Sequence, residues 1–495
     1  MSTPLLGLAA VIGLAAGLRL HELGARSLWI DELFSVGLAV QDLRTTLAVL
    51  YGEEANMALY YAIMHLWLGL VGAAPSEVLA RLPSVVFGLA SLWALYLVGT
   101  ELDHPLSGLL AALLGAVNAY HVGMSQEARA YTLWALCAAL AWLALLRALG
   151  GGGRPAWAAY ALTTALALYS HFFTVFIVFA QIVFVGLRGR WSELRALALS
   201  AMGAAALCLP FVPFFVLSHE GSQILHVRPN APRDLLDLFR LYAGGSTLLL
   251  GAYIVLGGLG VAVGWLGSGD WRGRVRRGAP VFWLLVPVVT AFLVSYVKPV
   301  FKERYLFAAM PAFPLLAGLG LAAIHPRPLG LAVALATLAL SAGPLSGGIN
   351  TRQEENWRAA TQYLLASSCE SDGWIFISKR GQLGYEYYAG WLAGDQSTRP
   401  DLDVLEGFDW RELANAAAYR PTTSTYRALE SGTAGLSDFG ARHSRIWLVL
   451  AHEFDAVSGG DTSTAVRDWL IRHGYSAQQH TFQGIRVLLY ERAVS

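Results

Sequence analysis

Apolar runs alternate with short polar segments over the first 346 residues. A membrane-spanning helix needs about 20 apolar residues, and candidate runs lie around 4–20, 58–74, 82–101, 131–149, 155–170, 172–187, 196–218, 241–267, 280–298, 305–324 and 328–346. A shorter run at 105–119 begins with His104-Pro105, so we interpret it as re-entrant or as a broken continuation of the preceding span. The pattern predicts a polytopic α-helical membrane protein with about 11 spans, and about 13 at most.

Arginines gather in the loops on one side of this arrangement. They are Arg147, Arg154, Arg188, Arg190, Arg195, Arg272, Arg274, Arg276, Arg277 and Arg327. Basic loops mark the cytoplasmic face of membrane proteins, so the N-terminus is expected to be cytoplasmic. The polar segment 21–57 and everything after about residue 346 then lie on the outer face.

The pattern changes after Asn350, where charged residues return. Short β-rich runs appear at 374–377, 445–450 and 485–490, and helix-like stretches lie at 357–366 and 464–473. Strands that alternate with helices are typical of an α/β domain. We therefore divide the chain into a transmembrane domain (1–348) and an extracytoplasmic α/β domain (349–495).

Composition agrees with a membrane protein. The 495 residues are 56% hydrophobic and only 14% charged, whereas soluble domains are near 25% charged. The formal net charge of +1 gives no reason to expect nucleic acid. The three cysteines, Cys137, Cys208 and Cys369, show neither a disulfide framework nor a metal-binding spacing.

The stretch SLWIDELFS (27–35) places two carboxylates, Asp31 and Glu32, in apolar surroundings. It belongs to segment 21–57, which we expect to form one or two interfacial helices. The charges are either solvated or the acidic start of a helix over 33–40, or one of them is a general base at the lipid–water boundary. In the second case Trp29 and Phe34 anchor the loop at the membrane interface.

Other polar groups recur in the loops on the same face. Glu127, Arg129 and Tyr131 precede one span, His171 lies between two spans, and Lys302, Arg304 and Tyr305 precede another. Arginine can bind a phosphate through its two-donor fork. Taken singly, each has a structural explanation: interfacial snorkelling for the cations, the aromatic belt for the tyrosines, and a structural hydrogen bond for His171. Their recurrence on one face favours a common site.

Several motifs in order along 1–346 resemble one family. SLWIDELFS, NMALYYAIMHLW (56–67), ARLPSVVFG (80–88), SQEARAYTLW (125–134), YSHFF (169–173) and KERYLFAAMPAFPLL (302–316) look like the family 39 membrane glycosyltransferases. That superfamily includes the dolichyl-phosphate-mannose–protein mannosyltransferases and the lipid A aminoarabinose transferases. Many relatives carry His-Pro-Pro-Leu where this chain has Asn56-Met57-Ala58-Leu59.

The resemblance implies a GT-C fold and inverting transfer of a sugar from a polyprenyl phosphate to an acceptor on the outer face. Carried over by position, Asp31 is the catalytic base, and Glu32 supports it or binds the acceptor. Arg129 and Tyr131 line the second loop, and Arg304 meets the lipid phosphate. We count Asn56, Glu127, His171, Lys302 and Tyr305 as further candidate contacts of donor or acceptor.

No nucleotide motif is present, and no cofactor is expected. A divalent cation held by Asp31, Glu32 or Glu127 stays open. The expected partners are a polyprenyl-phosphate sugar, membrane lipids and an acceptor that is a protein, a glycolipid or a cell-envelope polymer. The expected location is a bacterial inner membrane. The alternatives are a transporter or flippase for a polyprenyl-linked sugar, and a non-catalytic envelope-assembly protein.

Overall fold

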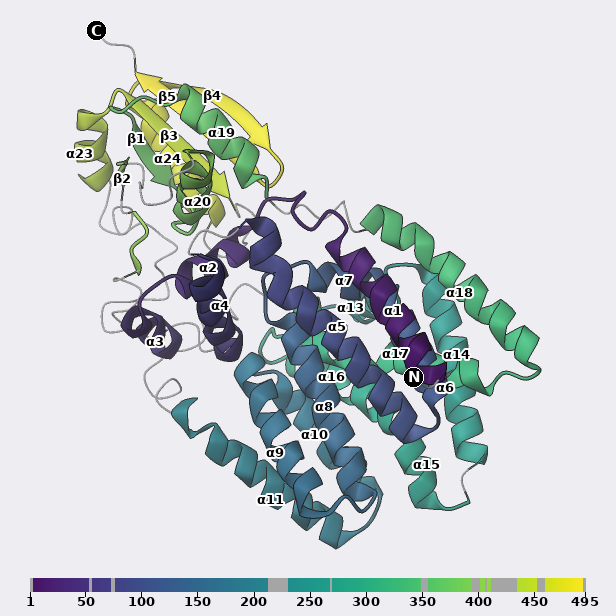
Figure 1. Cartoon of the computed structure of the whole chain (residues 1–495). Coiled ribbons are helices and arrows are strands. Elements are labelled where there is room, and N and C mark those ends of the chain that lie inside the picture. Colours follow the sequence, from purple (N-terminus) through teal and green to yellow (C-terminus); the bar gives the residue numbers. More distant parts are fainter. Residues whose placement is uncertain are drawn as a thin grey trace.

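The structure is a computed structural model that describes residues 3–52, 56–72, 76–211, 230–267, 269–348, 355–393, 401–405, 407–410, 434–451 and 459–492. A helical part carries a smaller part with a β-sheet at one end (Figure 1). The helices of the first 211 residues are α1 (Thr3–Leu20), α2 (Ile30–Ala39), α3 (Leu43–Gly52), α4 (Ala58–Val71), α5 (Glu77–Leu102), α6 (Pro105–Ala116), α7 (Ala119–Ser125), α8 (Tyr131–Leu149), α9 (Gly153–Ser170), α10 (Thr174–Leu187), α11 (Trp191–Leu207) and the short η1 (Leu209–Phe211).

The helical part continues with α13 (Pro232–Tyr242), α14 (Thr247–Leu266), α15 (Trp271–Arg277), α16 (Ala279–Val294), η2 (Glu303–Ala309), α17 (Ala312–Ala323) and α18 (Arg327–Gly348). These bounds follow the predicted apolar runs closely, and α8 coincides with the run at 131–149. The end of the predicted run 196–218 lies outside the described residues beyond Phe211. As expected, segment 21–57 contains two helices, α2 and α3.

Fewer helices qualify as complete spans than the sequence suggested. Within the described residues, α5, α8, α14 and α18 are long and apolar enough to cross a membrane. The number rises to 7 if three bent pairs each count as one span: α6 with α7 (bent by 69°), α15 with α16 (61°) and η2 with α17 (42°). The apolar helices α4 and α10 have 14 residues each, which is about 21 Å at 1.5 Å per residue and short of a bilayer core of about 30 Å.

The two ends of the helical part differ in chemistry. At one end, which we call the arginine end, Arg276 and Arg147 both pair with Glu101, with N–O distances of 2.8 and 3.6 Å. There the Trp271 indole donates to the Leu187 carbonyl (2.7 Å). The predicted basic loops therefore meet at one end, and the segment around Asp31 lies at the other.

The run at 105–119 does not continue the preceding span. Helix α6 returns along α5, because Gly108 lies against Gly99 and Gly115 against Leu92. The break falls between α6 and α7 instead. Both ends of α4 lie at the Asp31 end of the molecule. Before α4, Asn56 contacts Phe172, and after α4, Glu77 contacts Arg358. Helix α4 therefore enters and leaves at the same end, while α6 and α7 lead the chain back to the Asp31 end.

The C-terminal part contains the predicted strands and helices. Its elements are α19 (Trp357–Ser367), β1 (Gly373–Phe376), α20 (Gly381–Ala393), β2 (Asp403–Val404), α23 (Ala434–Arg442), β3 (Arg445–Ala451), α24 (Gly459–Arg472), β4 (Tyr475–Phe482) and β5 (Ile485–Arg492). The strand order is β2-β1-β3-β5-β4, with β2, β1 and β3 parallel and β5 and β4 antiparallel. The edge strand β4 was not predicted, because its side chains are mostly polar and exposed.

Alternating residues of the sheet divide the core into two layers. Ile375 and Leu448 pack with α23 and α24 in a separate cluster. Trp374 and Trp447 face the side of α19 and α20, and that cluster is continuous with the core of the helical part. Because side chains alternate between the faces of a strand, one face of the sheet is connected through α20 to the segment that carries Asp31.

Candidate active site

Helix α2 carries both carboxylates of SLWIDELFS in its first turn. Trp29 has extended backbone dihedrals at the N-cap, and its N–H donates to Glu32 Oε2 (3.2 Å). A glutamate three residues after the N-cap satisfies a backbone donor that the helix leaves unpaired. Glu32 therefore fits the expectation of an acidic residue that caps the start of a helix. Asp31 does not cap the helix in this way.

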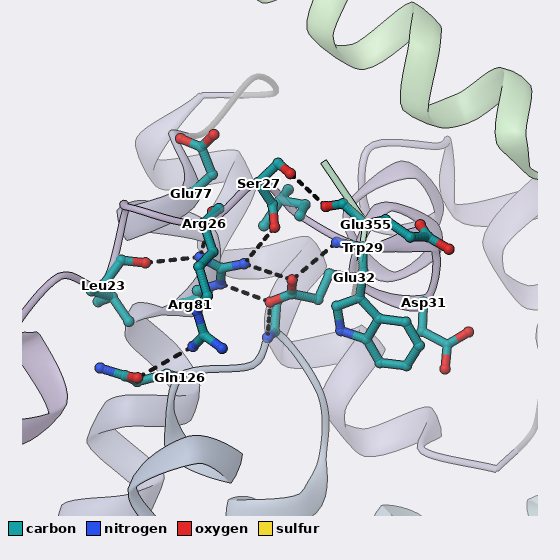
Figure 2. A network of polar contacts seen from close by, with 12 residues as sticks. Leu23, Arg26, Ser27, Trp29, Asp31, Glu32, Glu77, Arg81, Gln126 and Glu355 are labelled. Carbon is teal, nitrogen blue, oxygen red and sulfur yellow. Dashed lines mark hydrogen bonds and ion pairs between the residues drawn. The ribbon is translucent and has the colours of Figure 1, made fainter. Parts of the chain in front are cut away.

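Glu32 is fully buried and forms a two-pronged ion pair with Arg81 of α5. Arg81 Nη2 donates to Glu32 Oε2 (2.7 Å) and Arg81 Nε donates to Glu32 Oε1 (2.8 Å). The remaining Arg81 donors reach the carbonyls of Leu23, Arg26 and Ser27 (Figure 2). The Ala128 N–H also donates to Glu32 Oε1 (2.8 Å). Glu32 thus joins α2, α5 and the loop 126–130 in one rigid network.

Asp31 points away from this network (Figure 2). Its side chain is 29% exposed, and its Oδ2 lies 3.6 Å from Arg304 Nη1 and 3.9 Å from Arg129 Nη2. Two neighbouring cations favour the charged form of a carboxylate. Both distances are longer than a tight charge-assisted hydrogen bond, about 2.8 Å.

Arg129 is almost fully buried and bound to α2 and α4. Its Nη1 donates to the Asp31 carbonyl (3.2 Å), to Ser35 Oγ (3.2 Å) and to the Tyr61 hydroxyl (3.3 Å). Such a fixed cation is a positioned element of the site and not a snorkelling side chain.

Arg304 lies over the ring of Trp29, with its Cζ 4.8 Å from the ring centroid, and its side chain is 21% exposed. The ammonium group of Lys302 lies 5.7 Å from the centroid of Tyr305. Stacking on an aromatic face holds a cation while leaving its N–H groups able to bind an anion. η2 therefore brings Arg304 to Asp31, and Lys302, the residue before η2, lies over the ring of Tyr305.

His171 lies in the turn between α9 and α10 and stacks on Trp134, with 4.4 Å between ring centroids. Tyr305 approaches the same imidazole at 5.6 Å. Burial and, to a lesser extent, Arg129 lower the pKa of His171 to about 3, so the ring is neutral at neutral pH. Its Nδ1 accepts from the Phe173 N–H (3.2 Å), which leaves the proton on Nε2.

Three buried polar atoms near these residues have no hydrogen-bond partner among the described residues: His171 Nε2 and the hydroxyls of Tyr131 and Tyr120. A buried polar group without a partner costs about 1–3 kcal/mol. Both phenols interact electrostatically with Arg304 and Glu127. Arg304 and Glu127 therefore lie near both phenols, and Arg129 lies near His171. A polar ligand would satisfy the three atoms.

The remaining candidates, Asn56 and Glu127, lie near the residues described above. Asn56 Oδ1 accepts from the Phe172 N–H (3.0 Å) and so ties the start of α4 to the turn at His171. Glu127 lies close enough to Tyr120 and Tyr131 to act on both electrostatically. Within the described part of the chain, no three His, Cys, Asp or Glu side chains are grouped to hold a metal ion. The metal option considered for Asp31, Glu32 and Glu127 has no such cluster there, and we derive no step through a metal.

Phe34 and Trp29 do not anchor the loop in lipid. Phe34 is fully buried beneath the C-terminal part, with Trp410 at 5.3 Å between centroids and the Arg380 guanidinium 4.3 Å from its ring centroid. Trp29 is also buried and covered by Arg304. The interfacial role expected for both rings is wrong, since protein takes the place of lipid on each.

Sequence reasoning did not single out several residues that build the site. Arg81 lies in a motif that we quoted, and an ionisable residue inside an apolar helix was the signal that could have identified it. Glu355 and Tyr388 bind the segment before Asp31, and Tyr388 also binds Glu77 at the start of α5. Each of these contacts joins residues more than 300 positions apart in the sequence. No local pattern in the sequence predicts such pairs.

Comparison with solved structures shows which known proteins have a similar fold. No protein-family model matches the sequence, and no curated protein matches it. Among solved structures, ArnT from Cupriavidus metallidurans in the apo state is 12% identical, with a TM-score of 0.65 over 99% of this chain and 98% of that chain. ArnT from the same organism bound to undecaprenyl phosphate is 13% identical, with a TM-score of 0.63 over 97% of each chain.

The oligosaccharyltransferase of Archaeoglobus fulgidus, in complex with Zn and sulfate, also matches. It is 12% identical, with a TM-score of 0.54 over 98% of this chain and 73% of that chain. At these identities the likeness concerns the fold. The chain shares the fold of these proteins over nearly its whole length, which confirms the type of helical fold expected from the sequence motifs, while the expected number of about 11 spans stays a prediction.

Proposed function

We propose that this protein is an inverting glycosyltransferase that moves a sugar from a polyprenyl phosphate to a hydroxyl or phosphate of an extracytoplasmic acceptor. The observation that carries the proposal is the meeting of Asp31 Oδ2 with Arg304 and Arg129 at 3.6 and 3.9 Å. A partly exposed carboxylate beside two cations provides a base and an anion-binding surface in one place. Supporting it, the ArnT structure of the same fold holds undecaprenyl phosphate.

In the proposed reaction Arg304 and Lys302 bind the donor phosphate. Asp31 accepts the proton of the acceptor hydroxyl, and the acceptor oxygen forms a bond to the anomeric carbon from the face opposite the phosphate. The bond between the anomeric carbon and the phosphate oxygen breaks, and its electron pair stays on the phosphate. Arg304 and Lys302 stabilise that charge as it grows. The partnerless Nε2–H of His171 and the hydroxyl of Tyr131 supply hydrogen bonds for a sugar.

Donor binding also changes Asp31. In the structure Asp31 Oδ2 faces two guanidinium groups, and neighbouring cations favour the charged form of a carboxylate. A phosphate competes with Asp31 for Arg304, which leaves the carboxylate a stronger base. The site therefore gains its proton acceptor when the donor arrives.

The orientation follows from the two ends of the molecule. We propose that the arginine end is cytoplasmic and that the Asp31 end and the C-terminal domain lie outside a bacterial inner membrane. Undecaprenyl phosphate is the lipid we favour. The acceptor, whether protein, glycolipid or cell-envelope polymer, is left to experiment.

The test is a transfer assay with purified protein, a panel of polyprenyl-phosphate sugars and mass analysis of the products. Asp31→Asn keeps the size of the side chain but removes the base, and should lower kcat by about 10²–10⁴-fold with little change in donor binding. Unchanged turnover would contradict the role of Asp31. Movement of the lipid across the bilayer without transfer by the wild-type protein would favour the transporter alternative.

Arg304→Lys tests the phosphate contact. Lysine keeps the charge but loses the two-donor fork, so KM for the donor should rise about tenfold or more. Arg442→Lys is the matched control, because Arg442 pairs with Asp403 on the exposed surface of the C-terminal domain. Equal tolerance at both positions would show that Arg304 does not bind the phosphate.

A further inference from the structure

In the segment that leads into α2, residues 28–30, each backbone N–H donates to a side chain. The Leu28 N–H donates to the Tyr388 hydroxyl (2.7 Å), the Trp29 N–H to Glu32, and the Ile30 N–H to Glu355 Oε2 (3.0 Å). Ser27 Oγ in turn donates to the Glu355 carbonyl (2.7 Å). Two of these three amides are therefore bound by the C-terminal part, 325 and 360 residues away.

Glu355 is itself held rigidly. Its side chain is buried, and the Oε2 that accepts from Ile30 also accepts from the Trp357 indole N–H (2.5 Å). Ile30 is the first residue of α2, where helical amides have no partner within the helix. A carboxylate at this point satisfies a bare amide and interacts favourably with the helix dipole.

Tyr388 is held from the opposite side. Its hydroxyl donates to Glu77 Oε1 at the start of α5 (3.0 Å) while it accepts from Leu28. Burial and then Glu77 raise the pKa of Tyr388 well above its usual value, so the phenol keeps the proton that this arrangement needs. Arg358 pairs with Glu77 as well. The same contacts thus join α5, α20 and the segment before Asp31.

We propose that Glu355 and Tyr388 are positioning residues, through which the C-terminal domain fixes the backbone of residues 27–30 and so the direction in which Asp31 points. Neither residue touches the reacting atoms; each acts through the amides before α2. The inference rests on the proposed function for its effect on catalysis, but the fixing of the segment does not depend on which reaction the protein performs.

The first measurement is amide hydrogen exchange in the full-length protein, followed in peptides that cover 27–35. Glu355→Ala and Tyr388→Phe should speed the exchange of these amides about tenfold or more, because each removes an acceptor. Glu355→Gln keeps an amide oxygen for both donors and should restore slow exchange. This readout needs no activity, so it tests the positioning even if the proposed reaction is wrong.

Two matched controls separate positioning from general loss of stability. Tyr475 is a buried tyrosine whose hydroxyl donates to the Gly440 and His443 carbonyls. Asp372 is a buried carboxylate that accepts from the Trp447 indole (2.7 Å). Both lie in the same domain away from α2, so Tyr475→Phe and Asp372→Ala should leave exchange at 27–35 unchanged. Equal acceleration in the controls and the test variants would overturn the proposal.

The second measurement is kinetic. A misplaced catalytic group costs up to about 100-fold in rate, so Glu355→Ala should lower kcat by about 10–100-fold with KM for the donor nearly unchanged, since Arg304 is intact. Glu355→Gln should recover most of the rate. A fall in kcat that Glu355→Gln does not reverse, or one that Asp372→Ala reproduces, would contradict positioning. Absence of transfer in the wild-type protein would instead count against the proposed function.

Discussion

At the scale of single residues, the two adjacent carboxylates of the first polar segment have different tasks. Glu32 is buried and accepts four hydrogen bonds, two from Arg81 and one each from the amides of Trp29 and Ala128. Asp31 is partly exposed and faces two cations. Neighbours on a helix point about 100° apart, because an α-helix has 3.6 residues per turn. This geometry buries the Glu32 carboxylate and leaves the Asp31 carboxylate partly exposed.

Arg81→Met tests the structural part of this division. It leaves Glu32 buried without its counter-charge, which should lower the free energy of unfolding by about 3–5 kcal/mol and the Tm in detergent accordingly. Arg442→Met, at an exposed ion pair, should cost at most about 1 kcal/mol. Glu32→Gln combined with Arg81→Met should lose less than the two single changes added together. Strict additivity would mean that the pair does not act as a unit.

The sequence pointed to the residues of the candidate site but not to the residues that hold them in place. Asp31, Arg129 and Arg304 could be proposed because charged groups stand out among apolar runs and fall in motifs of a known family. Arg81 was overlooked because its motif was considered only as part of the resemblance. Glu355 and Tyr388 could not be found, since their partners are backbone amides, which leave no trace in the side-chain pattern.

At the scale of elements, the positions of most helices followed from the hydrophobic pattern, but the number of complete spans and the path of the chain did not. The run at 105–119 was ambiguous because a short apolar helix after His104-Pro105 is compatible with either direction. Its direction is set by tertiary packing: small residues let α5 and α6 approach closely. A Cβ at Gly108 would lie 2.2 Å from the Tyr96 carbonyl oxygen. The strands β1, β3 and β5 were predictable since they are apolar, whereas the exposed strand β4 was not.

Gly108→Ala tests this contact. The added methyl group should force the helices apart, cost about 1–3 kcal/mol and lower the Tm in detergent. Gly258→Ala in α14 is the matched control, because a Cβ there would meet nothing within 4 Å, and alanine is a better helix former than glycine. Its Tm should stay the same or rise. A similar loss in both variants would show that close packing at Gly108 is not what holds α6.

At the scale of the whole molecule, the arrangement predicts which end of the protein faces each side of the membrane. The arginine end and the Asp31 end lie at opposite ends of the helical part, and the C-terminal sheet sits at the latter (Figure 1). Positive loops set orientation, so the Asp31 end should face outward. This orientation comes from the basic loops alone, and the fold by itself would allow either one.

Cysteine labelling tests the orientation in a chain whose own Cys208 and Cys369 are replaced by serine; Cys137 is buried. A membrane-impermeant thiol reagent should label Arg44→Cys and Ser476→Cys in intact cells. Ser192→Cys, at the start of α11 and at the arginine end, should react only after the membrane is permeabilised. All three positions are exposed. Labelling of all three in intact cells, or of Ser192→Cys alone, would refute the proposed topology.

The bond between Leu28 and Tyr388 also sets an order of events during synthesis. The two residues are 360 positions apart, which a ribosome covers in roughly 20–70 s at about 5–20 residues per second. Throughout that interval the helices can enter the membrane, but the amides before α2 have no acceptor from the C-terminal domain. Until the C-terminal domain has been made and has folded, the segment before α2 therefore lacks the contacts that hold it in the finished structure.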